Sequence, residues 1–355
     1  MERPARGQGR GATQREAARN ALAGFDPQEL RRWYHLMLLI RRFEEKAGEM
    51  YTRARIGGYT HLNIGEEATV VGAITALRPD DPIFSNYREH GHALARGIDP
   101  KPIMAELFGK ETGVVKGRGG SMHIFDAQHH FYGGYAIVGG PIALATGAAL
   151  AMDYLRSDRV VACIFGEGST NIGYFYESLN MAALWQLPVV YLFVNNQYAM
   201  GAPVHQDSAV PEIYRKACAF DITGERVDGM DVIAVHQAMQ RAVQRARQER
   251  RPTLLESVCY RYRGHSMADP ARYRTAEELK QWLARDPLPS FQRRLTEAGL
   301  LGDEEAARIE EEEPCRPLPL RLRAGRGRIA WPSSPTARPC TRRCRKRCAA
   351  TSTSC

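Results

Sequence analysis

Two polar segments with chemically useful side chains each follow an apolar run in the middle of the chain. The run 160–165 ends at Gly166-Glu167-Gly168, and the run 188–194 ends at Asn195-Asn196-Gln197-Tyr198. Glycines let a backbone approach a diphosphate closely. The Glu167 carboxylate, the Asn196 amide and the Tyr198 carbonyl offer the hard oxygens that Mg²⁺ prefers beside phosphate and water. The pattern therefore predicts a magnesium-diphosphate site, with an ordinary loop carboxylate at Glu167 as the alternative.

The elements around these segments must bring them together. Two short continuous apolar runs joined by a helix-length connection are typical of a parallel βαβ unit. The carboxyl ends of parallel strands meet at one edge of a sheet, where open α/β folds bind ligands. Residues 169–171 then lie where the N-terminus of a helix faces the ligand. The sequence predicts an α/β fold with a parallel sheet flanked by helices.

Further elements are predicted along the chain from periodicity, capping residues and breakers. Helices are expected over 26–47, 68–77, 142–155, 231–249 and 276–284, and a strand is expected over 252–259. The apolar helix over 142–155 is expected to be buried and closely packed against its neighbours, and the helix over 276–284 is expected to be the last one. Residues 113–140 are dense in glycine, which favours a ligand-cradling loop over a merely flexible surface loop. Residues 260–275 are polar and rich in arginine, and we expect a long active-site loop there.

The charge of the chain is concentrated at one end. The net charge is +9, but residues 314–355 hold eleven Lys/Arg and no Asp/Glu, so residues 1–313 carry −2. A nearly neutral body gives no support to a basic groove for nucleic acid. No apolar run approaches the roughly 18–20 residues that span a membrane, and the N-terminus lacks the apolar core of a signal peptide.

Cysteine is concentrated in the same place. Five of the eight cysteines lie in residues 314–355, whereas Cys163, Cys218 and Cys259 lie in apolar or helical contexts. Those three are expected to be small buried side chains of a protein in a reducing compartment. The segment 314–355 has three interpretations: a zinc site, a genuine basic tail, or an out-of-frame terminus. Residues 1–24 lack periodicity and are expected to be a disordered extension, which leaves 25–313 as the folded domain.

Five sequence blocks, in order, resemble one known family. They are Tyr87-Arg88-Glu89-His90-Gly91-His92, Gly117–His123, the Gly-Glu-Gly…Asn-Asn pair of segments, Asn180–Trp185 and Tyr260–Met267. The chain from about Phe25 to about Glu312 is similar to the α subunit of pyruvate dehydrogenase E1 components, which are thiamine-diphosphate-dependent 2-oxo acid dehydrogenases. The resemblance implies a thiamine-diphosphate-binding fold.

The resemblance also implies a set of site residues. Mg²⁺ is assigned to Glu167, which replaces the usual Asp, and to Asn196 and the Tyr198 carbonyl. The catalytic candidates are His265 and His61, with His90 as a further acid–base candidate. Thiamine diphosphate is assigned to Tyr87, Arg88, Ala136, Val138, Gly166, Gly168, Ser169, Asn196, Arg261 and His265. In the family, the carboxylate that activates the aminopyrimidine comes from the β subunit.

The implied activity is the oxidative decarboxylation of a 2-oxo acid, pyruvate being favoured, with acyl transfer to the lipoyl domain of an E2 acyltransferase. The implied assembly is an α₂β₂ heterotetramer with an E1 β subunit. Acetoin or branched-chain 2-oxo acid dehydrogenase α subunits remain alternatives, as does an inactive structural paralogue, to which Ala136, Pro141, Ala143 and Glu167 would point as departures from the family pattern. Ser266 matches a serine that is phosphorylated in mitochondrial relatives. A bacterial cytoplasmic location is expected ahead of a mitochondrial or plastid one.

Overall fold

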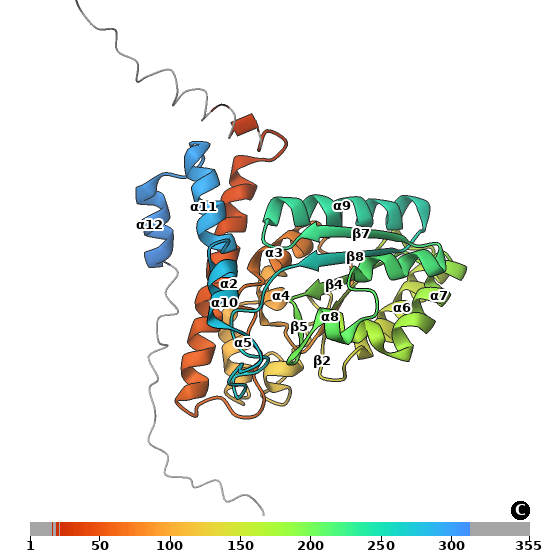
Figure 1. Cartoon of the computed structure of the whole chain (residues 1–355), viewed down its shortest axis with the longest axis horizontal. Coiled ribbons are helices and arrows are strands. Elements are labelled where there is room, and N and C mark those ends of the chain that lie inside the picture. The colour runs from red at the N-terminus through yellow and green to blue at the C-terminus, as the bar shows by residue number, and fades with distance from the viewer. Residues whose placement is uncertain (1–15, 17–18, 21, 313–355) are drawn as a thin grey trace, which may run out of the picture. The chain divides into compact units, whose positions relative to one another are not determined.

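The computed structural model describes residues 16, 19–20 and 22–312 (Figure 1). The predicted tail 314–355 lies outside the described residues, as does most of the predicted extension 1–24. The zinc site, basic tail or out-of-frame terminus considered for 314–355, and the disordered extension expected over 1–24, therefore stay predictions.

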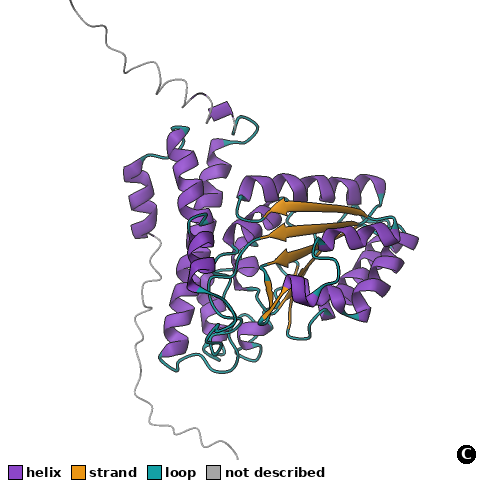
Figure 2. Cartoon of the chain, viewed as in Figure 1, coloured by secondary structure: helices purple, strands orange, loops and turns teal. Residues whose placement is uncertain are grey.

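A six-stranded parallel sheet forms the centre of the described chain (Figure 2). The strands are ordered β2-β1-β3-β4-β8-β7. Their bounds are β1 Ile83–Asn86, β2 Phe131–Tyr135, β3 Val161–Gly166, β4 Val189–Asn195, β7 Thr223–Asp228 and β8 Thr253–Val258; a separate antiparallel pair is β5 Tyr198–Ala199 and β6 Ala202–Pro203. The predicted fold class is confirmed.

Helices cover both faces of the sheet. The α-helices are α2 Pro27–Thr52, α3 Glu67–Thr75, α4 His90–Ala95, α5 Pro100–Leu107, α6 Gly140–Tyr154, α7 Gly173–Leu184, α8 Val204–Asp207, α9 Val232–Glu249, α10 Ala276–Leu283, α11 Pro287–Glu297 and α12 Asp303–Glu312. Short 3₁₀ helices are η1 Gly120–Met122, η2 Glu167–Asn171 and η3 Ile213–Phe220. In Figure 1, α9 lies along β7 and β8.

The two faces of the central strands belong to two hydrophobic cores. In β3, Ala162 and Ile164 join the core beneath α2, α3 and α9, while Val161, Cys163 and Phe165 join the core beneath α6 and α7. Strand β4 alternates in the same way. Because both faces are buried, both strands consist of apolar residues without polar alternation.

Capping residues explain where several helices begin. The Asp26 side chain accepts a hydrogen bond from Gln28 N ahead of Pro27, and Asp231 and Thr275 cap α9 and α10 in the same manner. These side chains satisfy N–H groups that lack a partner within the first helical turn. The predicted helices over 26–47, 68–77, 231–249 and 276–284 are confirmed, with small differences at their ends.

Three predictions about the helices and the buried cysteines were wrong. The helix predicted over 142–155 buries only one face within this chain, since Leu144 and Leu150 of α6 are exposed. The helix over 276–284 is not the last, because α11 and α12 follow it. Cys218 is exposed, whereas Cys163 and Cys259 are buried. Hydrophobicity alone does not reveal which apolar side chains find partners within the same chain.

Residues 260–275, all of them described, form a long loop without helix or strand, as predicted. Its main chain is fixed to the segment before α3, because Tyr262 N donates to Ile64 O (3.0 Å) and Met267 N donates to Thr60 O (2.9 Å). The glycine-dense stretch 113–140 is not all loop, since it contains η1, β2 and the first residue of α6.

Candidate functional site

The predicted site residues lie just beyond the carboxyl ends of four neighbouring strands. Tyr87 and Arg88 follow β1, Glu167 follows β3, Asn196 follows β4, and Arg261 comes shortly after β8. These strands are adjacent in the order β1-β3-β4-β8, and their register pairs Gly166 with Val194 and Asn195 with Val258. The topology therefore brings residues from distant parts of the sequence to one edge of the sheet.

Two of the three oxygens that were predicted to bind a metal converge on a single point. Arg261 Nη1 donates to Asn196 Oδ1 (3.2 Å) and to the Tyr198 carbonyl (2.8 Å). The guanidinium is almost fully buried, and its Nη2 donates to Met200 O and to the Tyr273 hydroxyl. Two oxygens that share one positively charged donor are arranged to face a cation.

The third oxygen donor, Glu167, is buried beside them. Its Oε1 has no hydrogen-bond partner among the described residues. Burial raises the pKa of the Glu167 carboxyl to about 7, against the opposing effects of backbone hydrogen bonds and the charge of Arg261. A buried carboxylate oxygen without a donor is costly unless a proton or a cation satisfies it. Glu167 therefore fits a cation ligand better than it fits an ordinary loop carboxylate.

The described residues contain no group of three or more His, Cys, Asp or Glu side chains that could hold a metal ion. The set at this edge is of a different kind, with one carboxylate, one amide and one main-chain carbonyl. Such a set suits a hard cation that takes its remaining ligands from phosphate and water. The residues present thus fit magnesium bound together with a diphosphate.

A carboxylate that the sequence did not reveal connects the site. Glu66 Oε1 accepts from Asn196 Nδ2 (2.7 Å), and Glu66 Oε2 accepts from Asn63 Nδ2 (3.0 Å). The same carboxylate lies 3.6 Å from Arg88 Nε. Glu66 therefore orients the Asn196 amide so that its oxygen points toward Arg261. The sequence signal was weak, since Glu66 is one of two adjacent acids at the start of α3.

Arg88 is buried and hydrogen-bonded to two main-chain oxygens. Its Nη1 donates to Leu62 O (2.7 Å), and its Nη2 donates to His265 O (2.8 Å). Burial lowers the pKa of Arg88, although the nearby Glu66 carboxylate opposes the shift. Arg88 thus ties the loop that carries His265 to the segment that carries His61.

Two of the predicted histidines meet beside Tyr87. The ring centroid of His61 lies 4.5 Å from that of Tyr87 and 5.1 Å from that of His265. Burial, reinforced by the charge of Arg88, lowers the pKa of His61 to about 2 and that of His265 to about 4. The Nδ1 atoms of both rings are buried and have no hydrogen-bond partner among the described residues. Both imidazoles are therefore neutral at pH 7 and free to bind a polar ligand.

His90, the third histidine, does not join this pair. Its Nδ1 pairs with the Glu44 carboxylate (3.0 Å), and its Nε2 pairs with Ser121 Oγ (2.8 Å). Because both ring nitrogens have partners inside the protein, the prediction of an acid–base role for His90 is not supported. The histidine is structural.

The glycines around Glu167 differ in how tightly they are packed. A Cβ on Gly168 would lie 2.8 Å from Ala199 Cβ, whereas a Cβ on Gly166 would meet nothing closer than 4.0 Å. Close packing against the Ala199 side chain of β5 therefore favours glycine at position 168, whereas position 166 has room for a Cβ. Ser169 is buried in η2, immediately after Gly168, where its main-chain N–H belongs to the predicted diphosphate cradle.

Ala136 and Val138 lie in the turn between β2 and α6. Val138 is 49% exposed and Ala136 is partly buried. Ala136 is not among the described non-glycine residues with positive φ, so alanine is compatible with the backbone where the family has glycine. The contact of this turn with a cofactor stays a prediction.

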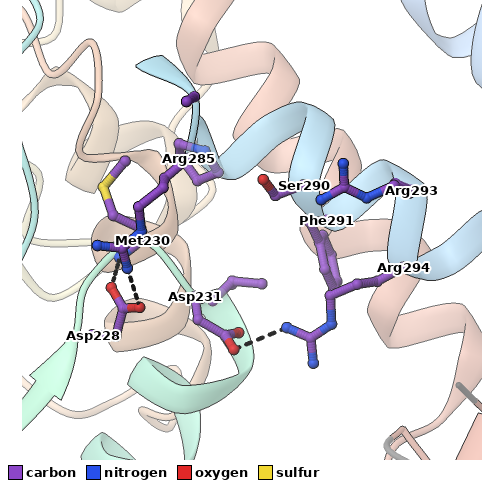
Figure 3. Close-up of a pocket in the computed structure, with 11 residues that line it drawn as sticks. Asp228, Met230, Asp231, Arg285, Ser290, Phe291, Arg293 and Arg294 are labelled. Carbon is purple, nitrogen blue, oxygen red and sulfur yellow. Dashed lines mark hydrogen bonds and ion pairs between the residues drawn. The ribbon is translucent and has the colours of Figure 1, made fainter. Parts of the chain in front are cut away.

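A separate cleft lies beyond the end of β7, between α9 and α11 (Figure 3). Arg285 pairs with Asp228 (2.6 Å), and Arg294 pairs with Asp231 (2.9 Å). None of the described residues that line it was predicted as a site residue. Its charges largely neutralise one another, so we do not assign the chemistry to this cleft.

The fold and the site together define an α/β protein with buried charges and neutral imidazoles at the carboxyl edge of a parallel sheet, which is the edge where open α/β folds bind ligands. Among the described residues, none of the helices has the length and apolar character that crossing a membrane requires.

Comparison with known proteins names the family. The model of the dehydrogenase E1 component family matches residues 35–314. The pyruvate dehydrogenase E1 component subunit alpha of Rhizobium meliloti is 46% identical over 299 residues, which cover 84% of this chain and 86% of the relative. The subunit of the same name from Porphyra purpurea is 46% identical over 284 residues (78% and 83%), and the chloroplastic subunit alpha-3 of Arabidopsis thaliana is 42% identical over 285 residues (79% and 67%). The chain belongs to the dehydrogenase E1 component family, and the resemblance found in the sequence is confirmed.

Proposed function

We propose that this chain is the α subunit of a pyruvate dehydrogenase E1 component. In this role it takes part in the oxidative decarboxylation of pyruvate and the transfer of the acetyl group to the lipoyl domain of an E2 acyltransferase. The observation that carries the proposal is the convergence of Glu167, Asn196, Tyr198 and Arg261 at one edge of the sheet. The relatives named pyruvate dehydrogenase subunit alpha support the choice of substrate.

Thiamine diphosphate and Mg²⁺ are the proposed cofactors. The Glu167 carboxylate, the Asn196 amide oxygen and the Tyr198 carbonyl would hold the metal. The main-chain N–H groups of Gly168 and Ser169 and the charge of Arg261 would hold the diphosphate. When bound, thiamine diphosphate supplies the electron sink that the loss of CO₂ requires.

The protein's own residues then act on the substrate side. His61 and His265 are neutral at pH 7, so each can accept or donate one hydrogen bond at its partnerless Nδ1. Because their pKa values of about 2 and 4 disfavour uptake of a proton at pH 7, these imidazoles act as neutral hydrogen-bond partners that can orient a polar substrate. Arg88 holds the His265 main chain in place, and the His61 side chain is buried, with 5% of its surface exposed.

An exposed apolar surface supports a partner subunit. Helices α6 and α7 pack side by side, and large apolar residues on them are exposed: Leu144, Leu150, Tyr154, Leu184 and Trp185. Large exposed apolar side chains on neighbouring helices are typical of a protein interface. We propose that an E1 β subunit covers it in an α₂β₂ heterotetramer and supplies the carboxylate that activates the cofactor. A bacterial cytoplasmic location is proposed from the bacterial relatives.

The test is to co-express this chain with an E1 β subunit and to measure reduction of an artificial electron acceptor with pyruvate, thiamine diphosphate and Mg²⁺. Turnover that requires both cofactors is the expected result. Activity with acetoin or a branched-chain 2-oxo acid, and none with pyruvate, would move the assignment to those enzymes. A stable complex that is inactive with every substrate would indicate a structural paralogue.

A further inference from the structure

Three buried polar side chains from separate elements form one hydrogen-bonded chain. Glu44 comes from α2, His90 is the first residue of α4, and Ser121 lies in η1. The Glu44 carboxylate lies 3.0 Å from His90 Nδ1, and His90 Nε2 lies 2.8 Å from Ser121 Oγ. Glu44 and His90 are fully buried, and Ser121 is 4% exposed. Because Ser121 is buried, no substrate can reach its hydroxyl. The three side chains are therefore not a hydrolytic triad.

The two outer side chains of this group, Glu44 and Ser121, both bind the same short segment of backbone. Ser121 Oγ accepts from His61 N (3.5 Å), and Glu44 Oε1 accepts from Asn63 N (3.1 Å). These two N–H groups are two residues apart and flank Leu62. His90 sets the separation of the two acceptors, since it contacts both of them. The three side chains therefore act as a clamp on residues 61–63.

The His61 side chain needs such a clamp. Its Nδ1 has no hydrogen-bond partner among the described residues, and the ring lies against the rings of Tyr87 and His265 at centroid distances of 4.5 and 5.1 Å. Ring contacts of this kind restrain rotation weakly compared with a hydrogen bond to the ring. The direction in which the imidazole points must then come from the main chain that carries it.

We propose that Glu44, His90 and Ser121 are positioning residues that fix the backbone of residues 61–63 and thereby aim the His61 imidazole at the substrate. The inference deepens the proposed function, because it depends on a catalytic role for His61. It also assigns a purpose to the conspicuous His90, which contacts no part of the site directly.

The first test does not depend on activity. Amide hydrogen exchange over residues 60–64 is compared in the full-length chain and in Ser121→Ala, which removes a single oxygen. We expect exchange at His61 to become at least about 10-fold faster, because a lost anchor permits local opening. The matched control is Ser178→Ala, at another buried serine, whose Oγ has no partner among the described residues. Unchanged exchange in Ser121→Ala, or the same acceleration at His61 in Ser178→Ala, would overturn the proposal.

The second test uses the complex with an E1 β subunit. In Ser121→Ala we expect kcat to fall by about 5- to 50-fold while the KM for thiamine diphosphate stays unchanged, because misaimed catalytic groups lose rate without losing cofactor contacts. His90→Gln should have a similar effect, and the double variant should be no worse than the more impaired single variant. A rise in KM at constant kcat would contradict the positioning role. If the wild-type complex is itself inactive, the proposed function fails, while the exchange experiment still decides whether the clamp exists.

Discussion

Replacing Glu66 with glutamine tests whether this carboxylate organises the site. Both of its oxygens accept hydrogen bonds from side-chain amide groups, one from Asn196 Nδ2 at 2.7 Å and one from Asn63 Nδ2 at 3.0 Å. A glutamine has only one acceptor oxygen, so its NH₂ group must face one of the two amide NH₂ groups. One buried donor is then left without an acceptor, whichever way the glutamine is turned.

The size of the effect follows from these contacts. A buried donor without an acceptor costs about 1–3 kcal/mol. Loss of the Glu66 charge adds to this cost in the free energy of unfolding, but by less than the roughly 3–5 kcal/mol of a broken buried ion pair. The reason is that Arg88 Nε lies 3.6 Å from the carboxylate, and the guanidinium keeps its hydrogen bonds to Leu62 O and His265 O. We expect Glu66→Gln to lower the free energy of unfolding by about 2–4 kcal/mol. With a urea m-value of about 3 kcal/mol/M, the midpoint shifts by roughly 1 M.

The assay is urea unfolding of the full-length chain, followed by titration with thiamine diphosphate and Mg²⁺ in the complex. Because Glu66 orients Asn196, the affinity for the cofactor should also fall by about 10- to 100-fold. Glu212→Gln is the control, since Glu212 pairs with Arg215 on the surface and should shift neither measurement. If Glu66→Gln unfolds at the urea concentration of the wild type, the amide groups do not depend on Glu66 and the reasoning is refuted.

Three further predictions concern the cofactor segment and the apolar surface. Gly168→Ala should lower the free energy of unfolding by about 1–3 kcal/mol, because the new Cβ would contact Ala199. Gly166→Ala should change the free energy of unfolding only through the smaller backbone freedom of alanine, since its Cβ would meet no close neighbour. Thermal unfolding of the two variants compares them. Because burial raises the Glu167 pKa from 4.5 to about 7, its stabilising contribution is complete below pH 4.5 and is lost as the pH rises through 7. The free energy of unfolding of the wild type relative to Glu167→Gln should therefore fall by roughly 3 kcal/mol between pH 4.5 and 7.5, and a pH-independent difference would contradict the assignment. Leu144→Glu on α6 should abolish assembly with an E1 β subunit in size-exclusion chromatography and leave the free chain folded, while Leu283→Glu on α10 should assemble normally.

Strands β3 and β4 could be predicted because their residues are apolar on both faces. Strand β7, Thr223–Asp228, could not, because it lies at the edge of the sheet and three of its six residues are charged. Strand β2 was hidden by the two glycines in its five residues. In each case the strand is stabilised by pairing with a neighbour from a distant part of the chain, and no local pattern records that pairing.

The site divides in the same way. Glu167, Asn196 and Arg261 could be predicted, because each follows a strand or belongs to a recognisable motif. Glu66 could not, because its main partner, Asn196, lies 130 residues away in the sequence. The mistake about α6 has a related cause, since an apolar helix has the same sequence pattern whether the same chain or another subunit covers it.

The site is built from contacts between residues that are far apart along the chain, such as Arg88 with His265 across 177 positions. Contacts of this range carry a large entropic cost of loop closure, which makes them slow to form compared with local contacts. A chain that has been synthesised only as far as β5 contains Glu167 and Asn196 but lacks Arg261. A cofactor that binds only the native state would therefore stabilise finished chains selectively and leave truncated ones exposed to proteolysis.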